Sequence, residues 1–213
     1  MGSCRRAGRV RGGGGRMAGS DVVSDVSRML ETVLTGAMSS LTPPPAPIAQ
    51  VHDLMGVIPT APPLLTLFLY EVAEDPSLRN RPHIREAVAG GGVQLRKPPM
   101  ALILRYLLTA WGGDRVTEQR MLGRVMHVLY DDATLSGPAL VGSLAGLDEP
   151  INVTLSPLTL EERTRVWWAI QRPYRLSLNY ELRVANLDSE AVISGQPVQR
   201  RALRPSLATE VPR

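Results

Sequence analysis

The chain has 213 residues, 44% of them hydrophobic, and a formal net charge of +4, so it can bury one sizeable core and we expect a single domain. Its only cysteine, Cys4, excludes an intramolecular disulfide and a cysteine metal cluster, which is typical of a protein in a reducing cytosol. The longest apolar runs, residues 62–70 and 98–104, are much shorter than the roughly 20 residues of a transmembrane helix, so we expect no membrane span.

Residues 1–19 are rich in glycine and arginine, with five arginines and no acidic residue. A segment of this composition does not bury enough apolar surface to offset the entropy of ordering, so we expect it to be disordered. The arginines are not followed by the apolar stretch that a secretory signal requires. Because the composition changes abruptly after Met17, we expect Met17 to be the true start of the protein.

The next segment is predicted to form a helix, a connector and a short strand. Ser20 is expected to cap an amphipathic helix over residues 21–39, whose apolar positions follow the 3.6-residue period. Successive prolines in residues 41–47 break this pattern and predict a stiff connector. A short strand is expected at residues 48–54, followed by a proline-rich loop.

Two apolar strands are predicted on either side of a polar segment. Residues 64–72 are apolar on both alternating faces, which predicts a central strand covered on both sides. Residues 73–97, with a triglycine in the middle, predict a mobile hairpin tip or an extended loop. Residues 100–110 resume strand character and include Arg105. Either this arginine lies on a half-exposed face with its stem over apolar surface, or it forms a salt bridge across a subunit boundary.

A second helix is expected to begin at a Thr117 cap and to lie on the sheet through its apolar stripe. Residues 139–144 predict a short helical segment, and residues 151–155 alternate as a half-buried strand. The spacing of Thr159 and Glu162 is that of a capping box and predicts a third helix, ending near residue 170.

Aromatic residues gather near the end of this third helix. Trp167 and Trp168, with Tyr174, predict either a contact patch or, for at least one tryptophan, core packing. The last strand is expected over residues 174–184. Its apolar face should pack on the core, and its polar face should meet water or a neighbouring subunit.

The sequence contains no pattern that predicts catalysis. There is no G-x-S-x-G nucleophile motif, and the triglycine lacks the lysine and hydroxyl residue of a phosphate loop. Asp131 and Asp132 are neighbours at a helix end, where carboxylates more typically end the helix than form an acid/base pair. The three histidines have no partner at helical spacing for a metal site: His52, His83 and His127. We therefore expect no enzyme activity, no metal and no cofactor.

The end of the chain is predicted to be a flexible basic arm, residues 189–213, because the hydrophobic period is lost there and prolines recur. Residues 191–213 contain four arginines and one acidic residue, and with the leader they leave a net charge of −4 for residues 20–190. A mildly acidic body is a poor surface for phosphate backbones, so we expect no nucleic-acid partner.

Several blocks together resemble the cap, or tube-terminator, proteins of extracellular contractile injection systems, which are phage-tail-like particles. The blocks are LFLYEV with DPSLRN in residues 67–80, LRKPPMALILRYLLTAWG in 95–112, QRMLGRVMHVLYDD in 119–132 and LTLEERTRVWWAIQRPYRLSLNYELRV in 158–184. The resemblance spans about residues 21–188 and does not include the leader or the final arm.

The resemblance implies an α/β fold with a mixed, mostly antiparallel sheet flanked by helices, in a single cap domain over residues 20–188. It implies a ring-forming structural subunit, commonly a hexamer, that ends the inner tube and sheath at the end distal to the baseplate. The implied partners are other copies and the tube and sheath subunits, within a cytoplasmic particle. Two alternatives stay open: a baseplate or cargo adaptor of the same particle, and a nucleic-acid-binding module that uses the arginine-rich tails.

Contacts with neighbouring subunits are expected in residues 73–97 and in the C-terminal arm. Strand addition at an exposed sheet edge would supply backbone hydrogen bonds there. The candidate contact residues are charged, polar or aromatic side chains within the resembling blocks: Arg79, Asn80, Arg96, Lys97, Arg105, Trp167, Trp168, Arg172, Tyr174, Arg175 and Arg183.

Overall fold

The computed structural model of the chain describes residues 20–88, 92–145, 149–187 and 192–195. The chain divides into two compact units, and each is described by itself. The first, here called the body, comprises Met1–Asn80 and Pro99–Asp188, and the second, here called the small unit, comprises Arg81–Pro98 and Ser189–Arg213. The cap-domain boundaries 20–188 stay a prediction.

A six-stranded sheet runs through the body in the order β1-β2-β5-β8-β7-β6. β1 and β2 are parallel, and every other neighbouring pair in this sheet is antiparallel. The strands are β1 (Ile48–Val51), β2 (Leu64–Glu74), β5 (Met100–Trp111), β6 (Thr134–Leu135), β7 (Ile151–Leu155) and β8 (Ser177–Leu187). This arrangement confirms the expected mixed, mostly antiparallel α/β fold.

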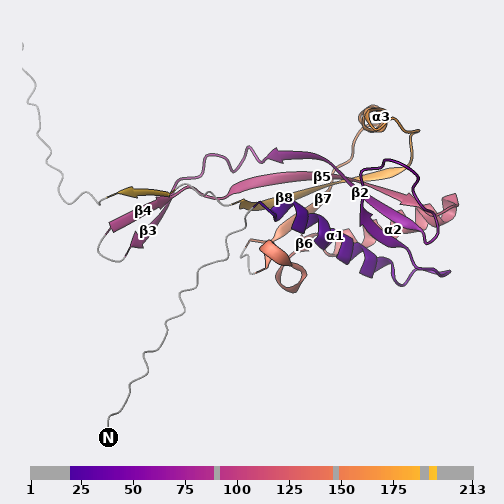
Figure 1. Cartoon of the computed structure of the whole chain (residues 1–213), viewed down its shortest axis with the longest axis horizontal. Coiled ribbons are helices and arrows are strands. Elements are labelled where there is room, and N and C mark those ends of the chain that lie inside the picture. The colour runs from indigo at the N-terminus through magenta and orange to yellow at the C-terminus, as the bar shows by residue number, and fades with distance from the viewer. Residues whose placement is uncertain (1–19, 89–91, 146–148, 188–191, 196–213) are drawn as a thin grey trace, which may run out of the picture. The chain divides into compact units, whose positions relative to one another are not determined.

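Helices cover both faces of this sheet. Figure 1 shows α1 and α2 on one side of the sheet and α3 on the other. Leu65 and Leu104 face α1 and α2, whereas Leu64 and Leu107 pack with Trp167 of α3. The two central strands are therefore covered on both sides, which the apolar residues on both faces of residues 64–72 predicted for β2. The helices are α1 (Val22–Met38), α2 (Arg115–Asp131) and α3 (Leu160–Ala169).

For two of the three helices, the N-cap is a different residue from the one predicted. α1 follows Asp21 rather than Ser20, and α1 has no side-chain cap. α2 follows Asp114, whose carboxylate accepts a hydrogen bond from the Thr117 amide at 2.9 Å. Asp and Thr are both good cap residues, so the one that precedes the first helical turn takes the role. The capping box of α3 at Thr159 is confirmed.

β8 begins later than predicted and its polar face is less exposed. It starts at Ser177, so Tyr174 is exposed instead of packing on the core. Ser177, Asn179 and Glu181 are buried, because α3 and the neighbouring strands cover the face that we expected to meet water or a neighbouring subunit. The segment at residues 139–144 also differs, since two 3-10 turns replace the single helical segment: Gly137–Ala139 and Gly142–Leu144.

The small unit contains a three-stranded antiparallel sheet in the order β3-β4-β9. Of the two alternatives predicted for residues 73–97, a hairpin tip or an extended loop, the structure shows a hairpin of β3 and β4, whose tip at 89–91 lies outside the described residues. Residues 192–195 form a strand, although we expected a flexible arm there, because they pair with the free edge of β4. The predicted leader and the rest of the arm also lie outside the described residues. The strands are β3 (Ile84–Val88), β4 (Gly92–Arg96) and β9 (Val192–Gly195).

Candidate functional site

Two clusters of polar and aromatic side chains on the body are the candidates for functional contact. Among the described residues, no group of three histidine, cysteine or carboxylate side chains is placed to hold a metal ion. None of the described helices is long and apolar enough to cross a membrane.

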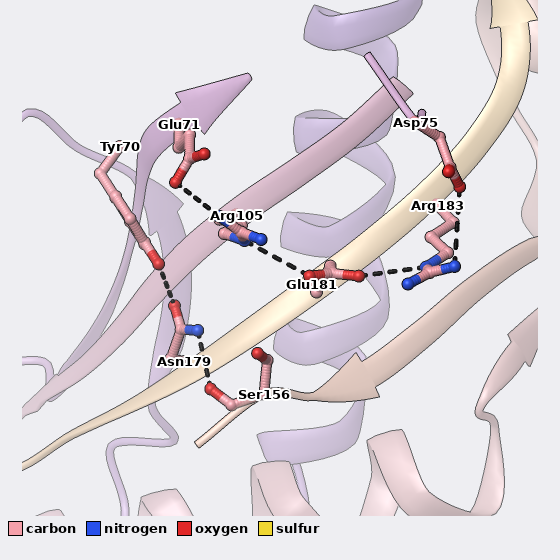
Figure 2. Close-up of polar contacts among 8 residues, drawn as sticks. All are labelled: Tyr70, Glu71, Asp75, Arg105, Ser156, Asn179, Glu181 and Arg183. Atoms are coloured by element: carbon pink, nitrogen blue, oxygen red, sulfur yellow. Dashed lines mark hydrogen bonds and ion pairs between the residues drawn. The ribbon is translucent and has the colours of Figure 1, made fainter. Parts of the chain in front are cut away.

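The first cluster is a row of charged side chains across β2, β5 and β8 (Figure 2). Arg105 lies at its centre, with Nη1 2.8 Å from Glu71 Oε2 and Nε 3.3 Å from Glu181 Oε2. Glu181 also accepts a hydrogen bond from Arg183 Nε at 3.0 Å, and Arg183 Nη1 is 3.6 Å from Asp75 Oδ2. Negative and positive groups alternate along the row, so each charge has an oppositely charged neighbour.

The position of Glu71 depends on an irregularity in β2. The β2–β5 register shifts between Leu69 and Glu71, which inserts Tyr70 as an extra residue and brings Glu71 opposite Arg105. The Glu71 carboxylate raises the pKa of Arg105 above its already high ordinary value, so the guanidinium stays charged. The pair has the geometry of a strong charge-assisted hydrogen bond.

The bulge residue itself joins a second line of hydrogen bonds (Figure 2). Tyr70 Oη donates to Asn179 Oδ1 at 2.8 Å, and Asn179 Nδ2 donates to the Ser156 carbonyl oxygen at 2.8 Å. Burial raises the pKa of Tyr70, so its hydroxyl remains protonated and able to donate at neutral pH. These bonds tie β2, β8 and the end of β7 together on one face.

Arg105 is thus satisfied by carboxylates of its own chain. Its side chain is 34% exposed, in agreement with the expectation of a half-exposed face. A salt bridge from Arg105 across a subunit boundary stays a prediction. The sequence did not single out Glu71 or Glu181, because their pairing with Arg105 depends on strand register, which residue spacing along one strand does not reveal.

The second cluster surrounds Trp111, the last residue of β5. Its indole Nε1 donates to Thr66 Oγ1 at 3.0 Å. The guanidinium carbon atoms of Arg175 and Arg172 lie 4.1 Å and 5.9 Å from the centroid of the Trp111 ring. These distances are typical of cation–π contacts. Trp111 is therefore the residue on which the segment after α3 packs, and sequence reasoning missed it.

Both arginines also make polar contacts outside the Trp111 ring. Arg175 binds the carboxylate of Glu118 in α2, and Arg172 donates to the Gly56 carbonyl oxygen. The second bond ties residues 54–58 to the end of α3, where Leu54 and Ile58 are buried in the same apolar cluster as Trp167.

The adjacent tryptophans of α3 have opposite environments. Trp167 is 1% exposed, and its Nε1 donates to Ser177 Oγ at 3.4 Å, so it is a core residue. Trp168 is 81% exposed. Tyr174 is exposed as well, as are two side chains of the loop that Arg172 holds. We call these four exposed side chains the α3 patch: Met55, Val57, Trp168 and Tyr174.

The remaining predicted contact residues lie elsewhere. Arg79 Nε is 3.5 Å from Glu74 Oε2 near the end of β2, and Asn80 is exposed. Arg96 belongs to the small unit, where its Nη1 is 3.8 Å from a Glu86 oxygen. The exposed Lys97 also belongs to the small unit. The structure therefore brings Arg105 together with Arg183 at Glu181, and Arg172 together with Arg175 over the ring of Trp111.

Two solved structures share the fold of this chain. One is the sheath/tube terminator of PVC, an extracellular contractile injection system, in the extended state; its TM-score is 0.58 at 19% identity, over 89% of this chain and 65% of that chain. The other is the anti-feeding prophage tube-terminating cap, with a TM-score of 0.52 at 20% identity, over 87% of this chain and 60% of that one. The chain therefore spans less than two thirds of either structure's chain.

Sequence comparison gives the family. A search of curated proteins finds no match. Residues 25–201, which are most of the chain and contain both clusters, match the family described as the Pvc16 N-terminal domain. The resemblance to tube terminators is thereby confirmed, and this chain belongs to the Pvc16 N-terminal domain family.

Proposed function

We propose that this chain is a ring-forming structural subunit that ends the inner tube and the sheath of a contractile injection system at the end distal to the baseplate. The observation that supports this proposal is the fold shared with a sheath/tube terminator over 89% of the chain and with a tube-terminating cap over 87%. The proposal assigns the chain no reaction and no cofactor. It places the chain in a particle assembled in the cytoplasm.

The physical requirement for a terminator is an asymmetric subunit. The end of a stacked tube presents the surface to which the next ring would add, because each ring binds the next through a head-to-tail contact. A terminator binds that end with one surface and presents a different surface outward. Addition then stops.

The body suits this role because its sheet is cross-linked. Central strands covered on both faces resist deformation, since packed interiors have little free volume. The charged row from Glu71 to Arg183 adds polar links across β2, β5 and β8. Surfaces carried by such a sheet keep their relative positions under mechanical load during contraction.

The α3 patch is the proposed contact with the tube or the sheath. It contains an exposed tryptophan, an exposed tyrosine and an exposed methionine, which are residue types enriched at the centres of protein interfaces, together with Val57. Other proposed contacts are the remaining predicted residues that are not core residues: Arg79, Asn80, Arg96, Lys97, Arg105, Arg172, Arg175 and Arg183.

Deletion of the gene tests the proposal. We expect tubes and sheaths of uncontrolled or unstable length by electron microscopy, and normal particles when the wild-type gene is restored. Particles of normal length and contractility in the deletion strain would refute a cap. A label on the protein should appear at the end distal to the baseplate, whereas a label at the baseplate would favour an adaptor.

A further inference from the structure

We propose that neighbouring copies join head to tail by charge, with the basic small unit of one copy docking on the acidic body of the next. This inference rests on the proposed ring and adds to it the chemistry of the contact between copies.

The sequence distributes its charges unequally between the two units. Residues 20–80 and 99–188 of the body contain 11 arginines and 17 carboxylate side chains, a net charge of −6. The small unit contains eight Arg or Lys residues and three carboxylates, a net charge of +5. The arginines of the leader raise the total to +4, so the charge of the whole chain does not reveal this split. Units of opposite charge attract each other over about a Debye length, roughly 10 Å at 0.1 M salt.

No described side chain of β3 or β4 is fully buried. Ile84 is 44% exposed, Arg85 and Glu86 are exposed, and residues 93–96 are only half-buried. Short strands whose side chains stay accessible to solvent gain stability when another surface covers them. Arg85 and Lys97 are exposed and form no ion pair with another described residue, which leaves both charges available to a partner.

The two edge strands of the body, β1 and β6, offer little room for strand addition. On the edge strand β1, the outward amides of Ala49 and Val51 donate to Thr35 Oγ1 at 3.0 Å and to Glu31 Oε1 at 2.5 Å. Two side chains of α1 thus occupy the edge to which an added strand would bind. The other edge strand, β6, has only two residues. Docking at these two edges therefore depends on side chains and their charge more than on strand addition.

Opposite charges on separate units suit a contact in which one copy uses its small unit and its neighbour uses its body. A two-fold pair would use both surfaces of both copies and stop at two copies, whereas the proposed ring requires a head-to-tail contact, with one neighbour on either side of each copy. In a head-to-tail contact each copy uses its small unit once and its body once, and the sequence of contacts can close into a ring. Charge complementarity of this kind also sets register and raises the association rate.

The test uses the purified full chain, sedimentation velocity and charge reversal. We expect oligomers whose dissociation constant rises at least about tenfold when sodium chloride is raised from about 50 mM to about 500 mM. The variant Arg85→Glu/Lys97→Glu should abolish assembly at low salt. The matched control, Arg28→Glu/Arg120→Glu, changes the total charge equally but makes the body more acidic, so it should assemble at least as well as the wild type.

Two further measurements exclude misfolding and a two-fold contact. The milder Arg85→Gln/Lys97→Gln should weaken assembly while circular dichroism and thermal unfolding stay unchanged. A copy with a charge-reversed small unit can still accept a wild-type small unit on its body, but it cannot dock on a further copy. Mixing it with the wild type in equal amounts should therefore give smaller assemblies. A two-fold contact would instead leave wild-type pairs intact.

Three results would overturn the inference: a wild-type chain that is monomeric at every salt concentration, assembly that ignores salt, or equal effects of the two charge-reversed variants. Failure of the proposed cap function can be distinguished from failure of the charge contact. Loss of length control in the deletion strain with salt-insensitive assembly would keep the cap and reject the charge contact. Normal particles in the deletion strain with the predicted assembly would reject the cap alone.

Discussion

The hydroxyl groups of Ser27 in α1 and Tyr106 in β5 are 2.7 Å apart and form a buried hydrogen bond between the helix and the sheet. The Ser27 hydroxyl also lies 3.0 Å from the Val23 carbonyl oxygen, to which it can donate. Tyr106 can then donate to Ser27 in turn, which satisfies both hydroxyls inside the core. This contact holds α1 against the central strand β5.

The substitution Tyr106→Phe tests this bond. Ser27 keeps its bond to the Val23 carbonyl, so we expect a loss of only about 1 kcal/mol in the free energy of unfolding, measured by denaturant titration. Burial raises the pKa of Tyr106 from 10.0 to about 12. The folded state therefore holds the phenolic proton more tightly, and this contribution to stability is complete below pH 10.0 and is lost as the pH rises to about 12.

The pH dependence of the free energy of unfolding distinguishes the buried Tyr106 from an exposed tyrosine. Tyr106→Phe should flatten part of the alkaline decline in stability, and Tyr130→Phe, at an exposed position of α2, should leave it unchanged. If the two variants showed the same alkaline decline, the assigned role of Tyr106 would be wrong.

A close approach between α1 and the second 3-10 turn gives another prediction. Asp25 Oδ2 accepts a hydrogen bond from the Ser143 amide at 2.7 Å, and a Cβ added to Gly142 would lie 2.5 Å from the same oxygen. Gly142 also has a φ of +63°, which favours glycine. Gly142→Ala should therefore lower the free energy of unfolding by more than the roughly 1 kcal/mol of backbone strain alone.

Gly137→Ala is the matched control for Gly142→Ala. Gly137 has a similar φ of +59°, but a Cβ there would meet nothing within 4 Å. The difference between the two alanine variants measures the clash with Asp25. Equal losses would show that Asp25 does not approach Gly142 in solution.

The same carboxylate should make stability depend on acid pH. The hydrogen bond from the Ser143 amide lowers the pKa of Asp25 below 3.8. Its contribution is complete above that ordinary value and disappears as the pH falls through the folded-state pKa. Asp25→Asn should remove this part of the acid dependence in urea titrations across that range. An unchanged acid profile would contradict the assignment.

The charged row predicts an unequal cost for two arginine substitutions. Arg105→Met leaves Glu71 and the largely buried Glu181 facing each other without their shared cation, so we expect a loss of about 1–2 kcal/mol. Arg165→Met breaks only an exposed helical pair with Glu161 and should cost less than about 0.5 kcal/mol. Denaturant titration at low and high salt measures both.

A second substitution shows whether Glu181 causes the cost. Glu181→Gln in the Arg105→Met background should recover part of the lost stability, because it removes one of the two facing charges. Additive losses in the double variant would contradict a direct interaction between Arg105 and Glu181.

The neighbouring tryptophans should separate stability from assembly. Trp167→Ala empties a buried site and should cost about 3–5 kcal/mol. Trp168→Ala removes an exposed ring, so its thermal unfolding should match the wild type while its co-sedimentation with purified tubes or sheaths decreases. Undiminished co-sedimentation of the Trp168 variant would remove the α3 patch from the proposed contacts.

The sequence alone determined the three helices and the long strands of the body. Residues 64–72 and 100–110 were predicted as strands, and the apolar residues on both faces of 64–72 predicted coverage on both sides, because a side-chain period of two records burial on each face. The 3.6-residue period located the helices, and the capping box at Thr159 placed the start of α3. These signals are local, so they can be recognised without knowledge of any partner segment.

Tertiary structure decided what those segments contact. The bulge at Tyr70 brings Glu71 opposite Arg105, and pairing with β4 converts residues 192–195 from an expected arm into a strand. Packing of α3 buries Trp167 and leaves Trp168 exposed, although the two are adjacent in sequence. Register, bulges and helix placement arise from contacts between residues far apart along the chain, and local periodicity carries no information about which distant segment will be the neighbour.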